Sequence, residues 1–310
     1  MNVANPVVEK TLAFAEFDTT LMSAAKDSPW LNNGAVTEAF NPSFSVLERL
    51  LSIPVRNKAV TRSGRFAQGV DAWLAHELRR AGFDADLVWP RPEAPRVLSS
   101  DILELLRKLP ERLADEVHES IMSGKAGSTD ARILGRAYMK QTDVVMTHWC
   151  TGPELLLSTK AMTSSFGKNL ANRYEEAYGD AANLRARYPL AAVGFFFVQR
   201  ATILESEPAA FRRTVDMIRK LRDFGDGFGY TATGLLLVDW DDTAENPEVK
   251  CVHAPVPADI AAPQFLNAMV DAVLKVTPID LHEAARARRA GEVAPLPGHD
   301  AVDEQQDALF

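Results

Sequence analysis

The sequence is poor in cysteine and in metal-binding motifs. Its two cysteines, Cys150 and Cys251, lie far apart and form no CxxC pair. Closely spaced cysteines are the usual ligands of structural zinc, so no zinc cluster is expected, and two isolated thiols are typical of a reducing compartment. The six histidines form no HExxH or similar motif.

Long hydrophobic runs are also missing. No apolar run reaches the roughly 18 residues that a membrane-spanning helix requires. The first residues carry acidic side chains early and lack the basic region and cleavage site of a signal peptide. These two absences predict a cytoplasmic protein without a membrane segment.

Basic residues are fewer than acidic ones. The formal net charge is −8, and the segment 291–310 holds five acidic residues and no lysine or arginine. That segment accounts for −5 of the charge and leaves −3 for the remaining residues. This balance argues against a protein that binds nucleic acid through overall basic charge. It is compatible with an enzyme that binds a polyanion in a localised cleft.

The chain is long and apolar enough, at 310 residues and 46% hydrophobic, to bury a large core. Residues 1–66 predict a mostly helical N-terminal arm, and residues 67–290 predict the main domain. A helical insertion is expected at about 98–125, with a break at Pro110. The acidic segment 291–310 has the composition of a disordered tail.

Strand-like and helix-like patterns alternate in the main domain. The strand-like runs are 137–149, 153–162, 191–204 and 234–241. The amphipathic helical stretches are 68–83, 168–187, 209–224 and 262–276. This alternation predicts an α/β fold, with a central sheet whose faces are covered by helices.

One strand ends in a lysine. The run LLLSTKAM, residues 155–162, places Ser158 and Lys160 on the same face of a strand because side chains alternate. Burying the Lys160 amine costs free energy unless an anion or carboxylate receives it. The preceding strand offers Asp143, flanked by apolar residues. Two other interpretations stay open: Asp143 bonded within a turn, and Lys160 extending to solvent.

The next helix carries a second candidate acid. Its apolar stripe consists of Leu170, Tyr174, Ala177, Tyr178 and Ala181. Glu175 lies on the flank of this stripe, whereas Glu176 points away from it. Two carboxylates and a lysine could hold a divalent cation and an attacking water near a phosphodiester. An ordinary surface position for Glu175 is the alternative.

These residues resemble the PD-(D/E)XK nuclease superfamily, typified by type II restriction endonucleases. That pattern has an Asp near the end of one strand and (D/E)-x-K on the next, here Asp143 and Ser158-Thr159-Lys160. Serine replaces the second acid, as in members that recover the acid from the following helix, a place that Glu175 could fill. The resemblance covers about 68–276. It implies a restriction-endonuclease-like mixed sheet flanked by helices.

The resemblance also implies a function, that of a Mg²⁺-dependent endonuclease of the type II restriction kind. Asp143, Glu175 and the Thr159 carbonyl would hold Mg²⁺, and Lys160 would orient the water. DNA contacts are expected from the first half of the following helix, at Lys168, Asn169, Asn172 and Arg173. Glu77, on the preceding helix, would either enter the site or form an ion pair in the core.

The expected reaction is therefore hydrolysis of phosphodiester bonds in double-stranded DNA, with Mg²⁺ as the cofactor and no membrane partner. Cutting both strands of a palindrome needs two active sites, so a symmetric homodimer is the expected assembly. Two alternatives remain: a nuclease of the same fold that acts in repair or on modified DNA, and a nucleic-acid-binding module without catalysis. Asp239, Asp241 and Asp242 form a further acidic group that could bind Mg²⁺ or simply lie in a solvated turn.

Overall fold

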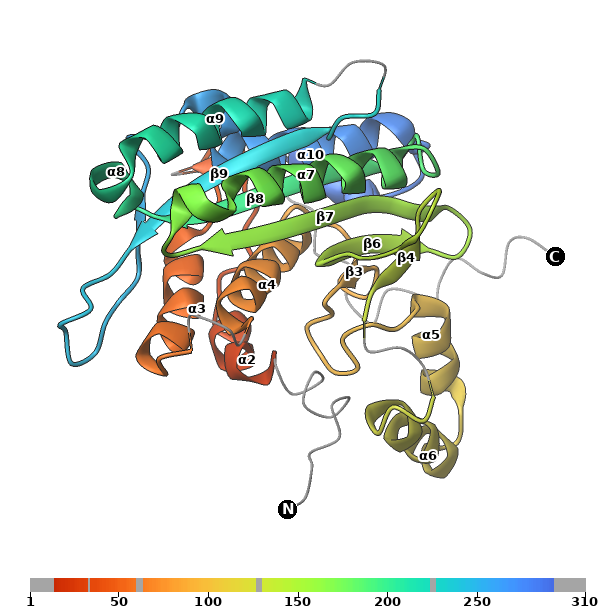
Figure 1. The fold of residues 1–310 in the computed structure, drawn as a ribbon. Helices are drawn as coiled ribbons and strands as arrows, with labels where there is room; N and C mark the ends of the chain where they lie inside the picture. The colour runs from red at the N-terminus through yellow and green to blue at the C-terminus, as the bar shows by residue number, and fades with distance from the viewer. Residues whose placement is uncertain (1–13, 33, 60–63, 127–129, 224–226, 293–310) are drawn as a thin grey trace.

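A six-stranded mixed sheet forms the centre of the molecule (Figure 1). The computed structural model describes residues 14–32, 34–59, 64–126, 130–223 and 227–292. In spatial order the strands are β10 (Lys250–Val252), β9 (Ala232–Asp239), β8 (Ala192–Arg200), β7 (Gly152–Met162), β6 (Val144–His148) and β3 (Val88–Trp89). The β7, β8 and β9 strands are parallel, whereas β6, β3 and β10 each run antiparallel to their neighbours. The expected α/β class with a mixed sheet is confirmed.

Helices cover both faces of this sheet. Those that pack directly on it include α4 (Arg65–Arg80), α7 (Phe166–Arg185), α9 (Pro208–Arg222) and α10 (Ala262–Val276). Leu155 and Leu157 of β7 belong to the core beneath α4 and α10, while Leu156 belongs to the core beneath α7 and α9. The strand thus buries both of its faces, which explains why its sequence is a continuous apolar run.

The N-terminal residues are continuous with the main core. Their elements are α2 (Ala15–Met22), β1 (Leu31–Asn32), β2 (Ala35–Val36) and α3 (Phe44–Arg56). Phe17, Trp30 and Leu50 are buried in the same cluster as Trp73 of α4. The described part of residues 1–66 therefore forms a layer under the sheet, and α4 begins at Arg65, before the expected boundary. Nearly all of the acidic segment 291–310 lies outside the described residues.

The expected helical insertion at about 98–125 consists of α5 (Ser100–Lys108) and α6 (Glu111–Met122), with Pro110 between them. It has a small core of its own, made by Leu98, Leu103 and Ile121. Figure 1 shows the two helices at the edge of the molecule, away from the layers that cover the sheet. The hairpin of β4 (Arg132–Leu134) and β5 (Met139–Gln141) follows the insertion.

The remaining differences from the expected elements lie at their ends. The run 137–149 is divided into β5 and β6, with Thr142 and Asp143 between them. The run 191–204 ends earlier as a strand, because its last residues start the short helix α8 (Ile203–Ser206). A final helix, α11 (Glu283–Arg289), packs into the main core through Ala285. Within the described ranges, no helix is both long enough and apolar enough to cross a membrane.

Candidate functional site

The candidate site lies where β6 and β7 separate. The first residue of β6, Val144, pairs with Leu157, and β7 continues beyond this pair to Met162. Asp143 precedes β6 and donates its backbone N–H to the Leu157 carbonyl at 3.0 Å. Its Oδ2 atom accepts the backbone N–H of Thr159 at 2.7 Å. A carboxylate therefore takes the place of the missing strand partner at this point of β7.

A second carboxylate reaches the same threonine from α4. The Thr159 hydroxyl donates to Oδ1 of Asp71 at 2.5 Å, and Asp71 is buried. Thr159 thus binds two acids at once, Asp143 through its N–H and Asp71 through its hydroxyl. The sequence interpretation missed Asp71, although a signal was present. Asp71 is three residues before Leu74 and seven before Leu78, so it is an acid on the buried stripe of its helix.

Electrostatic interactions connect these two acids with Lys160. Burial, followed by the charge of Asp143, raises the pKa of Asp71 well above its ordinary value, and Lys160 opposes this shift. Burial also raises the pKa of Asp143, against the opposing effects of the Thr159 N–H and Lys160. Among the described residues, the Lys160 amine has no hydrogen bond or ion pair. The site therefore holds two carboxylates that a nearby positive charge would stabilise in their ionised form.

Both carboxylates of the site retain an oxygen atom that could bind a cation. Oδ2 of Asp71 and Oδ1 of Asp143 have no hydrogen-bond partner among the described residues. The Thr159 carbonyl leaves β7 on the same side as the Thr159 N–H, toward Asp143. The part of the chain that the structure describes contains no group of three or more His, Cys, Asp or Glu residues that could enclose a metal. Mg²⁺ needs no such group, since it commonly binds one or two carboxylates together with waters and substrate phosphate.

Glu77, also on α4, lies away from Asp71 and the candidate site. It lies six residues after Asp71, about 9 Å along the helix axis and on a different side of the helix. Its carboxylate is fully buried and accepts from the Ser43 N–H at 3.0 Å and from Arg80 Nη1 at 2.6 Å. Burial raises the pKa of Glu77 to about 7. Of the two expected arrangements for Glu77, the structure shows the ion pair in the core, and Asp71 is the α4 acid at the site.

The helix α7 places its acids differently from the expected pattern. Glu175 and Glu176 are both exposed, and Glu176 pairs with Arg173 at 2.6 Å. Asp180 is the α7 acid whose charge acts on Asp143, and it helps to raise the pKa of that carboxyl. Asp180 is buried and bonded to Lys140 and to the Tyr138 hydroxyl. No described contact joins Glu175 to Asp143, so its role as a metal ligand stays a prediction.

The residues expected to contact DNA lie in the first half of α7. Lys168 and Asn172 are exposed, whereas Asn169 and Arg173 are half-buried. The N-terminus of this helix is occupied by a carboxylate, because Glu207 accepts the N–H groups of Phe166 and Gly167 at 3.0 and 2.7 Å. The positive end of the helix dipole is thus already neutralised. Contact with phosphate at α7 would depend on the exposed side chains.

The acidic group at the end of β9 begins with Asp239, the last residue of the strand, and continues into a turn. Asp239 and Asp242 pair with Arg200 at 3.0 and 2.8 Å. Asp241 accepts from the backbone and the hydroxyl of Thr243. All three carboxylates therefore have protein partners, as in the solvated-turn interpretation.

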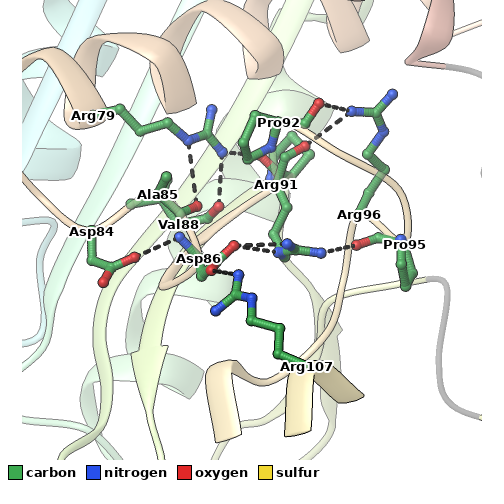
Figure 2. Close-up of polar contacts among 11 residues, drawn as sticks. Arg79, Asp84, Ala85, Asp86, Val88, Arg91, Pro92, Pro95, Arg96 and Arg107 are labelled. Atoms are coloured by element: carbon green, nitrogen blue, oxygen red, sulfur yellow. Dashed lines mark hydrogen bonds and ion pairs between the residues drawn. The ribbon is translucent and has the colours of Figure 1, made fainter. Parts of the chain in front are cut away.

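An arginine cluster braces the loop that follows β3 (Figure 2). We define it as Arg79, Arg91, Arg96 and Arg107 with Asp86. Asp86 accepts from Arg91 at 2.7 and 3.0 Å and from Arg107 at 2.6 Å. Arg79 donates to backbone carbonyls, including that of Val88 at 2.8 Å, and Arg96 donates to the Arg91 carbonyl at 3.2 Å. The cluster fixes the backbone of residues 90–96.

Comparisons with known proteins found no matching family model, no similar curated protein and no similar solved structure. The resemblance to PD-(D/E)XK nucleases therefore rests on the residues and their arrangement in this chain. Of the expected site residues, the structure brings together Asp143, Thr159 and Lys160, and it adds Asp71.

Proposed function

We propose that this protein is a Mg²⁺-dependent endodeoxyribonuclease of the PD-(D/E)XK type, which hydrolyses phosphodiester bonds in double-stranded DNA. The observation that carries the proposal is the position of Asp143, directly before β6, next to the part of the adjacent antiparallel strand β7 that holds Lys160, with Asp71 joined to Asp143 through Thr159. Raised pKa values at buried acids beside an unpaired lysine are typical of functional sites.

Each side chain has a distinct role in this proposal. Asp71 and Asp143 hold the metal with their free oxygens, while Thr159 fixes the other oxygen of each carboxylate. The metal supplies positive charge that lowers the pKa of a bound water and stabilises the attacked phosphate. The Lys160 amine has no ion pair among the described residues, so it can bind the water or a phosphate oxygen.

The assembly and biological role follow from the substrate. One site cuts one strand, so cleavage of both strands at a symmetric sequence would use two copies related by a twofold axis. We therefore propose a homodimer of restriction type. Lys168, Asn169, Asn172 and Arg173 on α7 would contact DNA on either side of the cut.

The test is DNA cleavage with purified protein. Plasmid and genomic DNA of varied sequence are incubated with Mg²⁺ or Mn²⁺, and with a chelator as the blank. We expect cleavage by the wild type, and a loss on the order of 10²–10³-fold or more in Lys160→Ala and Asp143→Ala, because each variant removes charge that stabilises the transition state. Thermal unfolding should show that both variants fold.

A lysine variant outside the site provides the control. Lys220 forms an exposed ion pair with Asp216 on α9, so Lys220→Ala should cut like the wild type. A wild-type protein that cuts none of these DNAs, or a Lys160→Ala variant that cuts at the wild-type rate, would show that the proposed function is wrong.

A further inference from the structure

A two-stranded ribbon, the β4–β5 hairpin, lies next to the candidate site but outside the main sheet. Its residue pairs are Arg132–Gln141, Ile133–Lys140 and Leu134–Met139. The ribbon ends at Gln141, two residues before Asp143. Gln141 also lines, with Asp71 and Asp143, a cavity of about 280 Å³. A molecule bound at the site would therefore lie close to the ribbon.

One face of this ribbon is anchored on α7. Side chains alternate along each strand, so Ile133 and Lys140 share this face. Ile133 packs against the core beneath α7 and α9, and the Lys140 amine pairs with the buried Asp180 of α7. Asn183 of α7 holds the turn of the hairpin, because its Oδ1 atom accepts the N–H of Ala137 at 2.8 Å. The ribbon therefore has a fixed position relative to the site.

The opposite face of the ribbon is bare. It consists of Arg132, Leu134, Met139 and Gln141, which are all exposed. Leu134 and Met139, which face each other across the ribbon, are 42% and 47% exposed. The side chains of Arg132 and Gln141 have no hydrogen bond or ion pair among the described residues. Exposed apolar side chains that gather beside unpaired polar ones indicate a contact surface.

The charge of the ribbon indicates the kind of partner. Residues 131–142 contain two arginines and one lysine and no acid, a charge of +3 in a chain of −8. Lys140 is paired with Asp180, which leaves Arg132 and Arg136 as the exposed positive charges. Neither of these arginine side chains has a partner in the part of the chain that the structure describes. This local excess of positive charge fits a polyanion.

The dimensions of the bare face match a groove of DNA. The major groove of B-DNA is about 12 Å wide and admits a two-stranded β-ribbon. The residue pairs of β4 and β5 span about 10 Å, the length of about three base pairs. The major groove of double-stranded RNA is deep and narrow, so it excludes such a ribbon. The shape therefore favours double-stranded DNA.

The side chains of the bare face are those that distinguish bases in the major groove. Arginine donates two hydrogen bonds to guanine, glutamine forms two with adenine, and apolar side chains contact the methyl group of thymine. Arg132 and Gln141 lie directly opposite each other, next to the pair of Leu134 and Met139. One face of the ribbon thus presents all three kinds of side chain.

We propose that the β4–β5 ribbon enters the major groove of the substrate DNA with its bare face toward the bases, where Arg132 selects a guanine and Gln141 an adenine. The proposal rests on the proposed nuclease function, which brings double-stranded DNA to Asp143. It identifies the residues that determine the sequence specificity of that enzyme. Two residues of extended chain span about 7 Å, so the selected bases lie within a few base pairs of the cut.

The experiment selects DNA by affinity without cleavage. The full chain, with Ca²⁺ in place of Mg²⁺, is mixed with a pool of duplexes of random sequence, and the bound fraction is sequenced. We expect the wild type to enrich a motif that contains a G·C and an A·T position. Arg132→Ala should lose selectivity on the order of 10-fold at the G·C position only, and Gln141→Ala at the A·T position only. Variants that enrich the wild-type motif unchanged, or a wild type that prefers no sequence, would refute the proposal.

A modified base tests whether the contact lies in the major groove. The selected guanine is replaced by 7-deazaguanine, which lacks the N7 acceptor of that groove. Fluorescence anisotropy should show wild-type binding weakened on the order of 10-fold, and no change for Arg132→Ala. An equal loss in both proteins would place the guanine contact on another residue and contradict the assignment of Arg132.

Two further variants separate base recognition from charge. Arg132→Lys keeps the positive charge but loses the planar fork, so it should retain its affinity for DNA of random sequence and lose the guanine preference. Arg56→Ala is the matched control, because Arg56 pairs with Glu248 near β10, at the opposite edge of the sheet. It should enrich the wild-type motif. Thermal unfolding should show that all of these variants fold, since each replaces an exposed side chain.

The two proposals fail separately. A motif that depends on Arg132 and Gln141, without metal-dependent cleavage, would support the ribbon and contradict the nuclease function. Cleavage that depends on Lys160, combined with an unchanged motif in both ribbon variants, would support the nuclease function and contradict the ribbon.

Discussion

The arginine cluster and the candidate site differ in how completely their charges are paired. In the arginine cluster, both oxygens of Asp86 accept hydrogen bonds, from Arg91 and from Arg107. At the candidate site, Asp71 and Asp143 each use one oxygen, and Lys160 has no ion pair among the described residues. Both clusters are largely buried, so burial alone does not distinguish them.

The pKa values of the acids show the same contrast. Burial raises the pKa of Asp86, but the bonds from Arg107 and Arg91 outweigh burial and leave that pKa below its ordinary value. At Asp71 and Asp143 the effect of burial is larger than that of the partners, and both pKa values are raised. A fully bonded carboxylate stabilises the fold, whereas a partly bonded one retains the capacity to bind a ligand. Under the proposed function, this difference separates a structural cluster, at Asp86, from a catalytic one, at Asp71 and Asp143.

The largest expected effect comes from the acid that the sequence interpretation missed. Asp71→Asn keeps an oxygen for the Thr159 hydroxyl but removes a metal-binding charge. We expect single-turnover cleavage to slow on the order of 10²–10³-fold. Thermal stability should be unchanged or slightly higher, because the variant removes a buried charge that Asp143 repels.

Glu175→Ala is the comparison for that variant. If Asp71 supplies the second acid, then Glu175→Ala should cut faster than Asp71→Asn by at least an order of magnitude. The reverse ranking would return the role to Glu175 and would show that α7, rather than α4, completes the site.

The arginine cluster should respond in the opposite way. Asp86→Asn removes the charge that compensates Arg91, whose side chain is only 4% exposed. We expect the free energy of unfolding to fall by about 3 kcal/mol, because a buried guanidinium loses its counter-ion. Chemical denaturation measures this loss. Cleavage at a temperature where the variant is folded should stay within a few-fold of the wild type, and a larger loss would mean that Asp86 acts at the site.

Much of the fold could be predicted from the sequence, because the central elements have strong periodic patterns. The expected helix 262–276 matches α10, and the expected strand 153–162 matches β7 to within one residue at its start. Strand β3 was missed because it has only two residues and is followed by prolines. The N-terminal layer was taken for an arm because apolar helices give no information about which distant residues they cover.

The site was predictable only where the strands determine it. The alternation of side chains along each strand, and the pairing of consecutive strands, were enough to place Asp143 near Lys160, since both follow from the local sequence. Asp71 depends on how α4 packs against β7, and that packing is a long-range contact that the sequence does not display. Glu77 and Asp71 carry the same stripe signal on α4, and only the structure shows which of them reaches Thr159.

The smallest expected effect concerns Glu77, where the effect of burial on the pKa can be distinguished from the effect of hydrogen bonding. Glu77 is bonded as fully as Asp86, yet burial outweighs Arg80 and the Ser43 N–H and raises its pKa from 4.5 to about 7. The folded protein therefore keeps this proton between pH 4.5 and 7, while the unfolded chain releases it. In that window the contribution of Glu77 to stability is present at the acidic end and is lost as the pH rises through about 7.

Relative to Glu77→Gln, which cannot titrate, the wild type should lose about 2 kcal/mol of unfolding free energy between pH 5 and pH 7. Denaturation of the two proteins across this range measures the difference, and a constant difference would mean that the bonds from Arg80 and Ser43 hold Glu77 ionised throughout.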